Sequence, residues 1–460
     1  MKRIILIALI LVPALFFKAN AQETTVLKEQ ITEVDDKVSG LTERLATDEA
    51  DLQKLAKIKV SGYVQAQWQN FENLNTQPSN YFSLKRTRIK FTYEATDGVK
   101  LVLQPDFSPG AVDLREAYVV LNDRWTKTLS LWAGKFNRPN YEVEYSSGQL
   151  ENLERSLIIR TLYPGEYALG AKVEYNPVNV PFHLQVALLN GNDGLTVNNS
   201  AGVNLNSNSN KDIDNYKDIM VRAVYKLKLG SFGGLDFGAH GYFGSIKSNA
   251  TQTLSSDYAT IKNVNIGDGI GRNWFGGEFQ FFADVLGGMS IKGEYIAGKN
   301  ATVGYAPIAA VGTTAAIPGV ANFQNNFAGY YLYFIKNLGS KNQFSFRYDY
   351  YDPNTDVTGK DVNVKKFTPA DATVVKSKTV GKSDLATSTF GFALHHYFDD
   401  NIRISLDYDI VNNEKVGTTA GVSNYMENYT KADGTVVKNG LDYSKNVNNN
   451  VLTLRIQAKF

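Results

Sequence analysis

Charged side chains recur at every second position in several segments of this chain. In residues 88–91, for example, Arg88 and Lys90 alternate with Ile89 and Phe91. Three further basic residues lie in segments with a strand-like pattern: Arg222, Arg347 and Arg403. Charges on one face of a strand would be costly in a dry core. They therefore indicate a wet face, either a soluble sheet open to water on one side or a barrel with water inside.

Other residue types that could do chemistry are sparse. The chain has no cysteine, which excludes thiolate catalysis and cysteine-based metal sites and suits an oxidising compartment. His395 and His396 are adjacent, so on a strand their rings point to opposite faces and cannot bind one metal together. His183 and His240 have no Ser or Asp arrangement near them. We expect no catalytic residue, no resident metal and no cofactor.

The segment 352–361 places oxygen-bearing side chains at alternate positions, beginning with Asp352, Asn354 and Asp356 and ending at Asp361. This pattern has two interpretations: a calcium loop, or a turn capped by its own carboxylates. The sixth position, where a calcium loop needs glycine, is Val357, and the terminal glutamate is missing. The pattern therefore favours the turn.

The first 21 residues predict an export signal. Lys2 and Arg3 precede an apolar run from Ile4 to Phe17, and Ala19-Asn20-Ala21 forms a small-residue cleavage site. No later stretch approaches the roughly 20 apolar residues of a membrane-spanning helix. The signal takes three of the 48 bases, so the mature chain, from about Gln22, is close to neutral against its 46 acids. This balance excludes a typical nucleic-acid binder.

Residues 22–57 carry a heptad repeat, which predicts a helix. Its apolar positions are Leu27, Ile31, Val34, Val38, Leu41, Leu45, Leu52 and Leu55. A stripe this narrow is typical of a parallel coiled coil, and β-branched residues at both core positions favour three strands. The alternative is an amphipathic helix that folds back on its own chain.

From Ile58 to Phe460 the apolar period changes to two, which predicts one large all-β unit. We expect sixteen antiparallel strands, with fourteen or eighteen as alternatives: 58–70, 82–95, 98–107, 112–122, 128–137, 166–176, 181–190, 216–229, 232–247, 271–284, 287–298, 325–337, 340–352, 385–398, 400–413 and 447–460. Short and long connections alternate along this series, as in a transmembrane β-barrel with periplasmic turns and external loops. Leu454, Ile456 and the terminal Phe460 share one face of the last strand, an ending that resembles the signal used by outer-membrane insertion machinery.

Residues 83–175 resemble the phosphate-selective porin O and P family, in particular its members of the Bacteroidetes type. The matching stretches are Ser83-Leu84-Lys85-Arg86-Thr87-Arg88-Ile89, Asp113-Leu114-Arg115-Glu116-Ala117-Tyr118, Trp132-Ala133-Gly134-Lys135-Phe136-Asn137-Arg138-Pro139, Ser146-Ser147-Gly148 and Leu153-Glu154-Arg155-Ser156-Leu157. The resemblance implies a sixteen-stranded trimeric barrel whose third external loop, here residues 141–164, folds inward to narrow a passage for anions. Many members of that family also have an N-terminal coiled coil.

Carried over to this sequence, the resemblance places Arg86, Arg88 and Lys90 on the lumen face of the second strand. Bases two residues apart would stand roughly 6.5 to 7 Å apart and could pass an anion along. At the narrowing, the loop supplies Arg138, Arg155 and Arg160, but also the acids Glu142, Glu144, Glu151 and Glu154. This mixture departs from an anion filter and favours a transverse field that admits small hydrophilic solutes in general.

We therefore predict an outer-membrane porin, not an enzyme, with a signal peptide (1–21), a periplasmic coiled-coil helix (22–57) and a β-barrel (58–460). Its solutes would be small hydrophilic molecules or ions, anions such as phosphate among them. Its partners would be outer-membrane lipid and two further copies of the chain, with peptidoglycan as another candidate and no nucleic acid. Two alternatives remain: an outer-membrane lipid hydrolase, which would need a Ser–His pair, and an anchor whose coiled coil tethers the membrane to the cell wall.

Overall fold

A computed structural model describes most of the chain. The described residues are 30–49, 52, 57–72, 79–108, 110, 112–163, 166–191, 196–198, 204–206, 212, 214–307, 309–310, 316–417, 429–430, 436–437, 443–447 and 449–460. The predicted signal peptide and the start of the predicted coiled coil lie outside them. The chain divides into two units, residues 1–59 and 60–460, which are described separately below.

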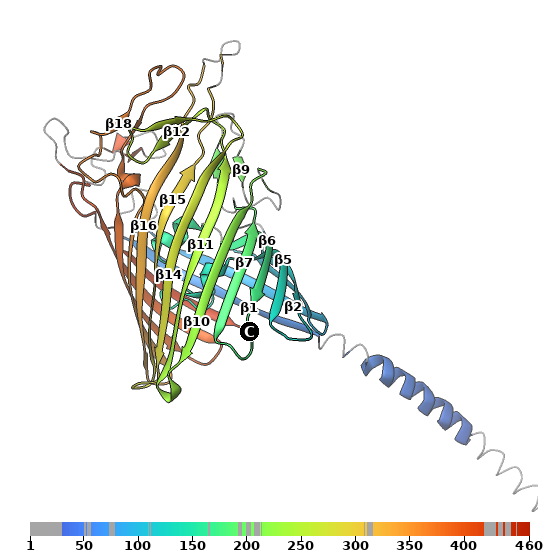
Figure 1. Cartoon of the computed structure of the whole chain (residues 1–460). Helices are drawn as coiled ribbons and strands as arrows, with labels where there is room; N and C mark the ends of the chain where they lie inside the picture. Colours follow the sequence, from blue (N-terminus) through green and yellow to red (C-terminus); the bar gives the residue numbers. More distant parts are fainter. Residues whose placement is uncertain are drawn as a thin grey trace, which may run out of the picture. The chain divides into compact units, whose positions relative to one another are not determined.

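In the first unit, residues 30–49 form a helix (Figure 1). Lys37 and Glu33 form an ion pair of 2.7 Å one turn apart, and Thr42 donates a hydrogen bond to the carbonyl of Val38. The predicted core positions are exposed, Ile31 by 55% and Val38 by 52%. Pairing of this stripe with another helix stays a prediction. Within the described part of the chain, no helix combines the length and apolar composition needed to cross a membrane.

In the second unit, sixteen antiparallel strands close into a barrel within the described residues (Figure 1). The first eight are β1 (Ile58–Phe71), β2 (Asn80–Thr96), β3 (Val99–Asp106), β4 (Asp113–Asn122), β5 (Leu129–Asn137), β6 (Tyr167–Tyr175), β7 (Phe182–Leu189) and β10 (Asp218–Lys228). The others are β11 (Gly233–Lys247), β14 (Gly269–Ala283), β15 (Met289–Thr302), β16 (Asn322–Leu338), β17 (Asn342–Asp352), β20 (Thr387–Tyr397), β21 (Ile402–Asn413) and β24 (Val451–Lys459). Pairing of β1 with β24 closes the barrel.

The predicted strands and their number are confirmed, with ends that differ by four residues at most. The largest shifts are at β15, which continues to Thr302 instead of 298, and at β24, which begins at Val451 instead of 447. Short strands also lie in the connections between the barrel strands: β8 (Thr196–Asn198), β9 (Asn204–Asn206), β12 (Gln252–Ser255), β13 (Ile261–Asn263), β18 (Lys366–Phe367), β19 (Lys378–Thr379), β22 (Tyr429–Thr430) and β23 (Val436–Val437). Of these, β12 extends the barrel sheet by pairing with β16. The short helices are η1 (Pro139–Glu142), α2 (Leu157–Leu162), η2 (Gly230–Phe232) and η3 (Lys382–Asp384).

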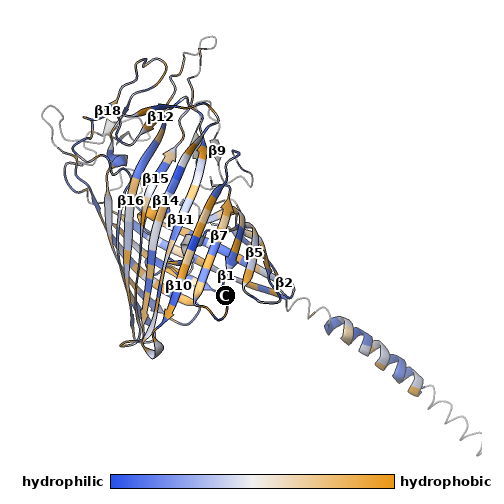
Figure 2. Cartoon of the chain, in the orientation of Figure 1, coloured by the Kyte–Doolittle hydropathy of each residue, from blue (hydrophilic) through white to orange (hydrophobic). Residues whose placement is uncertain are grey.

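The period of two places apolar side chains outside the barrel and polar ones inside it. On β24, Leu454 and Ile456 are exposed on the outer face, while Arg455 and Gln457 are buried inside. Figure 2 shows the same alternation of apolar and polar residues along the strands. An apolar exterior around a polar interior needs apolar surroundings and an aqueous lumen, as in a transmembrane barrel.

The connections differ between the two ends of the barrel. At one end, here called the turn end, the strands are joined by tight connections such as 97–98, 339–341 and 398–401. At the other, the loop end, connections such as 248–268 and 353–386 are much longer. The loops at this end pack around a small apolar cluster that includes Leu254, Tyr258, Phe323, Val362 and Val380.

The acidic segment 352–361 lies among these loops and behaves as the predicted turn. Asp352 accepts a hydrogen bond from the backbone N–H of Asn354 at 3.0 Å, and Asp361 accepts one from that of Thr358 at 2.8 Å. Asp356 accepts hydrogen bonds from side chains of neighbouring segments. In the described residues no group of three or more acidic or histidine side chains is arranged to hold a metal ion.

Candidate functional site: the loop inside the barrel

The connection between β5 and β6, residues 138–166, folds into the barrel and is here called the inner loop. Its apolar side chains explain this position, because Val143, Leu153, Ile158, Ile159 and Leu162 are at most 2% exposed. Burial of each such side chain is worth about 1.5–3 kcal/mol. The inner loop is therefore held inside the barrel by its own small hydrophobic core.

The apolar side chains of the inner loop pack against aromatic residues of β11, β14 and β16, here called the aromatic wall. Tyr242 and Trp274 stack with their ring centroids 4.0 Å apart, and Phe327 packs edge-on against Trp274. Tyr163, just after α2, accepts a hydrogen bond of 2.6 Å from the indole N–H of Trp274. The wall and α2 belong to one cluster of buried residues, which fixes the inner loop to this side of the lumen.

Polar side chains from six other strands donate hydrogen bonds to backbone carbonyls of the inner loop. Three of its carbonyls, those of Val143, Leu150 and Leu153, accept hydrogen bonds from Lys292 (2.6 Å), Arg403 (3.1 Å) and Arg455 (2.9 Å) respectively. The carbonyls of Ser147, Glu151 and Glu154 are bonded to Gln65, His395 and Arg347. A buried loop would otherwise leave these groups unpaired. The donors come from β1, β15, β17, β20, β21 and β24, so the backbone of the loop is hydrogen-bonded to six of the sixteen barrel strands.

The three bases predicted on β2 are on its inner face, and each is paired with an acid. Arg88 bonds Asp106 at 2.8 Å, and Lys90 bonds Glu116 at 2.6 Å. Arg86 lies 3.5 Å from Glu166 and donates to Gln65. Arg88 also donates to the hydroxyls of Tyr63, Ser147 and Tyr167. The three bases therefore form a row on the inner face of β2, but neighbouring carboxylates neutralise their charges. Their role in binding a solute stays a prediction.

The predicted bases of the inner loop occupy three different surroundings. Arg138 lies over the ring of Tyr163, its guanidinium carbon 5.5 Å from the ring centroid. Arg155 pairs with Glu166 and also donates to the carbonyl of Tyr145. Arg160 is exposed on the polar side of α2. The structure therefore does not gather these three residues into one cluster.

The predicted acids of the inner loop bond directly to side chains of the strands. Glu142 pairs with Arg222 at 2.6 Å, and Glu151 pairs with Lys292 at 2.9 Å. Glu144 accepts hydrogen bonds from the Tyr333 hydroxyl and the Ser156 N–H. Glu154 pairs with Lys85 at 2.6 Å and with Arg455 at 3.1 Å. These ion pairs and hydrogen bonds hold the inner loop against the strands, in addition to any effect of the acids on a solute.

Nearby basic side chains keep two carboxylates of the inner loop, those of Glu154 and Glu166, ionised. Burial would raise the pKa of Glu154, but the positive charges of Lys85, Arg455 and Arg86 outweigh it and hold that pKa well below its usual range. Burial would also raise the pKa of Glu166, but the positive charges of Arg155, Arg86 and Arg88 outweigh it. The pKa of Glu166 is therefore also held well below its usual range. Both groups stay ionised in any neutral or mildly acidic solution.

The three predicted strand bases outside β2 are buried as well. Arg222 bonds Glu278 at 2.5 Å, and Arg347 bonds Asp349 at 2.8 Å and Asp409 at 3.0 Å. Arg403 bonds the Leu150 carbonyl and Gln457. Sequence reasoning missed Lys292 and Arg455, although Arg455 alternates with the apolar residues of β24 and so carried the same signal.

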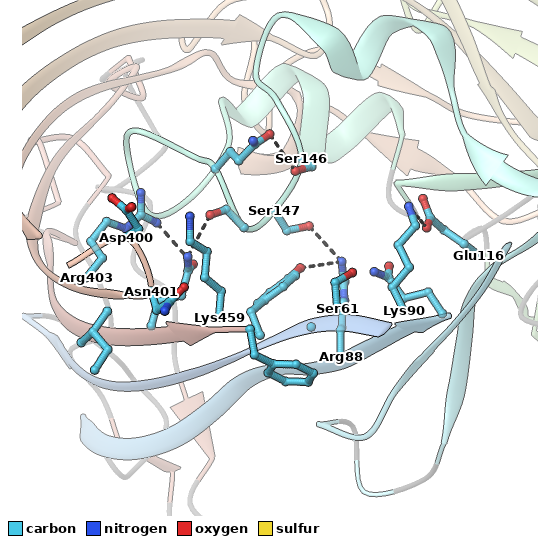
Figure 3. A pocket seen from close by; sticks show the side chains of 18 of the residues that line it. Ser61, Arg88, Lys90, Glu116, Ser146, Ser147, Asp400, Asn401, Arg403 and Lys459 are labelled. Carbon is cyan, nitrogen blue, oxygen red and sulfur yellow. Dashed lines mark hydrogen bonds and ion pairs between the residues drawn. The ribbon is translucent and has the colours of Figure 1, made fainter. Parts of the chain in front are cut away.

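Two cavities lie between the inner loop and the turn end of the barrel. The first, here the Arg88 cavity, has a volume of about 470 Å³ and is lined by Arg88, Lys90, residues of β24 and the 398–401 turn (Figure 3). The second, the Trp132 cavity, measures about 540 Å³ and is lined by Trp132, Lys172 and Arg222. Glu116, Asn137, Ser146 and Gln149 line both, so the cavities adjoin at the inner loop.

A closed sixteen-stranded antiparallel barrel with a loop fastened inside it places this chain in the porin class of folds. Residues 58–261 match the model of the family described as phosphate-selective porin O and P. The predicted family resemblance is thereby confirmed. Fold and family match indicate a channel rather than an enzyme and support an outer-membrane location.

Solved structures agree with this fold. OprB of Pseudomonas putida aligns with a TM-score of 0.56 and 10% identity, over 89% of this chain and 96% of that one. The outer membrane channel DcaP of Acinetobacter baumannii aligns with a TM-score of 0.50 and 12% identity, over 88% of this chain and 97% of that one. At such identities the likeness concerns the fold alone. A search of curated protein sequences found no match.

Proposed function

We propose that this chain is an outer-membrane porin through which small hydrophilic solutes diffuse passively, past a constriction made by the inner loop. The observation that carries the proposal is the fastening of this loop: side chains of β1, β15, β17, β20, β21 and β24 bond its carbonyls. A loop held so firmly inside a wide barrel narrows the lumen and sets which solutes pass.

The lumen charges argue for a channel of weak ion preference rather than a phosphate filter. The candidate solute-facing bases of β2 have carboxylate partners at 2.6 to 3.5 Å. An ion in transit therefore meets pairs of opposite charge instead of a row of free cations. The tether alternative gains no support from the family match or from the fold, and we do not propose it.

In the proposed arrangement the turn end faces the periplasm, the signal peptide directs export, and three copies assemble with residues 22–57 as a coiled coil. The exposed stripe at Ile31, Val34, Val38, Leu41 and Leu45 supports this assembly, since apolar positions of this spacing are typical of a coiled-coil interface.

Reconstitution of the purified, full-length protein in planar bilayers tests the proposed function. We expect discrete conductance steps, often in groups of three, and a reversal potential near zero in a salt gradient because the lumen bases are paired. A reversal potential at the anion limit would contradict the paired-charge argument. A folded, heat-modifiable barrel without any conductance would contradict the porin itself.

A cysteine placed at Val38 tests the coiled coil. The chain has no native cysteine, so a single thiol reports only its own position. In a parallel coiled coil, Val38→Cys brings like positions of neighbouring chains together and should give disulfide-linked dimers in high yield on non-reducing gels. Glu43→Cys, on the outer side of the same helix, is the matched control. Equal yields from the two variants would count against the coiled coil.

A further inference from the structure

The Arg88 cavity presents mostly neutral hydrogen-bonding groups. Eleven uncharged Ser, Tyr, Asn and Gln side chains line the Arg88 cavity, against six charged ones. Among the neutral ones are Tyr63, Ser146, Gln149 and Gln457. A wall of this composition suits a solute with many hydroxyl groups better than an ion.

Most charged residues around the cavities are already paired. Lys90 and Arg88 of the Arg88 cavity are bonded to Glu116 and Asp106. In the Trp132 cavity, Lys172 pairs with Glu174 at 2.5 Å and Arg222 with Glu278 at 2.5 Å. Lys459 and Asp400, which also line the Arg88 cavity, carry opposite charges (Figure 3). A bound ion would have to break such pairs, whereas a neutral hydroxyl can bond to paired groups without displacing either partner.

Four polar atoms in the wall of the Trp132 cavity are buried and, among the described residues, have no hydrogen-bond partner: Trp132 Nε1, Asn137 Oδ1, His183 Nε2 and Gln280 Oε1. His183 is 8% exposed and Gln280 7%. Leaving such a group unpaired costs about 1–3 kcal/mol. The set includes an obligatory donor, Trp132, and two amide acceptors. A hydroxyl group, which both donates and accepts, is complementary to all of them.

Aromatic side chains complete the wall. Tyr118, Tyr145 and Phe282 line the Trp132 cavity, and Tyr63 and Tyr167 line the Arg88 cavity. The C–H faces of a sugar ring are apolar and pack on such surfaces, while its rim of hydroxyls meets the amides and paired charges. Cavities of about 470 and 540 Å³ are within the range of small-molecule sites.

We infer that the two cavities together form a binding subsite for an uncharged, polyhydroxylated solute, a mono- or disaccharide, on the turn-end side of the inner loop. This inference rests on the proposed porin function, since the solute reaches the subsite by passing the loop. Gln149 and Asn137, which line both cavities, are the residues that bond the solute from the boundary between them. Gln149 is exposed and its amide oxygen accepts only a 3.2 Å hydrogen bond from Ser146, so its truncation costs the fold little.

The test is ion-current block in bilayers that contain the full-length protein. We expect maltose to produce saturable, transient block, and triethylene glycol, which has few hydroxyl groups, to lower the current only as it lowers bulk conductivity. Gln149→Ala or Asn137→Ala should weaken the maltose block about 2- to 10-fold, the loss of one or two neutral hydrogen bonds. Thr161→Ala, on the same loop but outside both cavities, should leave it unchanged.

Equal effects of maltose and triethylene glycol, or block by inorganic phosphate instead, would overturn the assigned solute class while leaving the porin intact. If the folded protein does not conduct, the proposed function fails, and calorimetric titration of maltose into the detergent-solubilised protein decides about the subsite. Heat of binding that is seen in the native protein and lost in Gln149→Ala would support the subsite. Absence of heat of binding in the native protein would contradict it.

Discussion

Deletion of residues 143–162, with the gap closed by a short Gly-Ser linker, should raise the single-channel conductance at least about threefold. A sixteen-stranded barrel without an insert leaves a wide aqueous channel, and these residues occupy its interior. The barrel itself should survive, because β1 and β24 close it without using the inner loop. Conductance steps in planar bilayers measure the change, and heat modifiability on gels reports whether the barrel is folded.

A deletion of equal length in the loop 353–386 is the matched control, because it shortens the chain without emptying the lumen. A milder variant, Lys292→Met, removes hydrogen bonds to the Val143 carbonyl and to Glu151 and leaves that carboxylate without its cation. It should give an unsteady current between the native and the deleted levels. Unchanged conductance after the deletion would show that the inner loop does not limit the flow.

The sequence predicted the barrel well because a barrel strand is a local pattern. The lipid side and the water side impose a period of two on each strand, which residues such as Leu454, Arg455 and Ile456 display without reference to any other segment. The ends of strands were predicted less accurately, since continuation of β15 to Thr302 depends on its pairing with Phe323 of β16. No local signal reports such a partner.

The inner loop could be located from the sequence, but its bonds could not. Glu154 and Lys85 lie far apart in the chain, and Glu154 and Arg455 lie 301 positions apart, so their pairing depends on where the folded loop crosses the lumen. The family resemblance predicted a row of bases at Arg86, Arg88 and Lys90 on the lumen face. Their neutralisation requires carboxylates from β3, β4 and the inner loop, which come together only in three dimensions.

Removing two of these carboxylates should turn the channel toward anions. Glu116→Gln frees Lys90, and Glu166→Gln removes the acid nearest to Arg86 and Arg155. A unit charge acts on an ion about 4 Å away by about 1 kcal/mol in water, with opposite sign for anions and cations, so each change should raise the anion-to-cation permeability ratio at least about fivefold. Reversal potentials in a salt gradient measure this ratio, and the shift should be largest at low ionic strength, where screening is weakest.

The double variant Asp257→Asn/Asp371→Asn makes the same change of formal charge in loops at the loop end, and it should leave the ratio nearly unchanged.

Mild acid should not mimic the loss of Glu166. Because its pKa is held well below the usual range, this carboxylate keeps its charge, and its contribution to stability, below the ordinary glutamate pKa of about 4.3. The contribution is lost only as the pH falls through the lowered value. Any change in the permeability ratio between pH 7 and about pH 5 should therefore be equal in the native protein and in Glu166→Gln, and a larger change in the native protein would contradict the lowered pKa of Glu166. A shift toward anions in the Gln variants at neutral pH would support the view that paired carboxylates, rather than missing bases, set the ion preference.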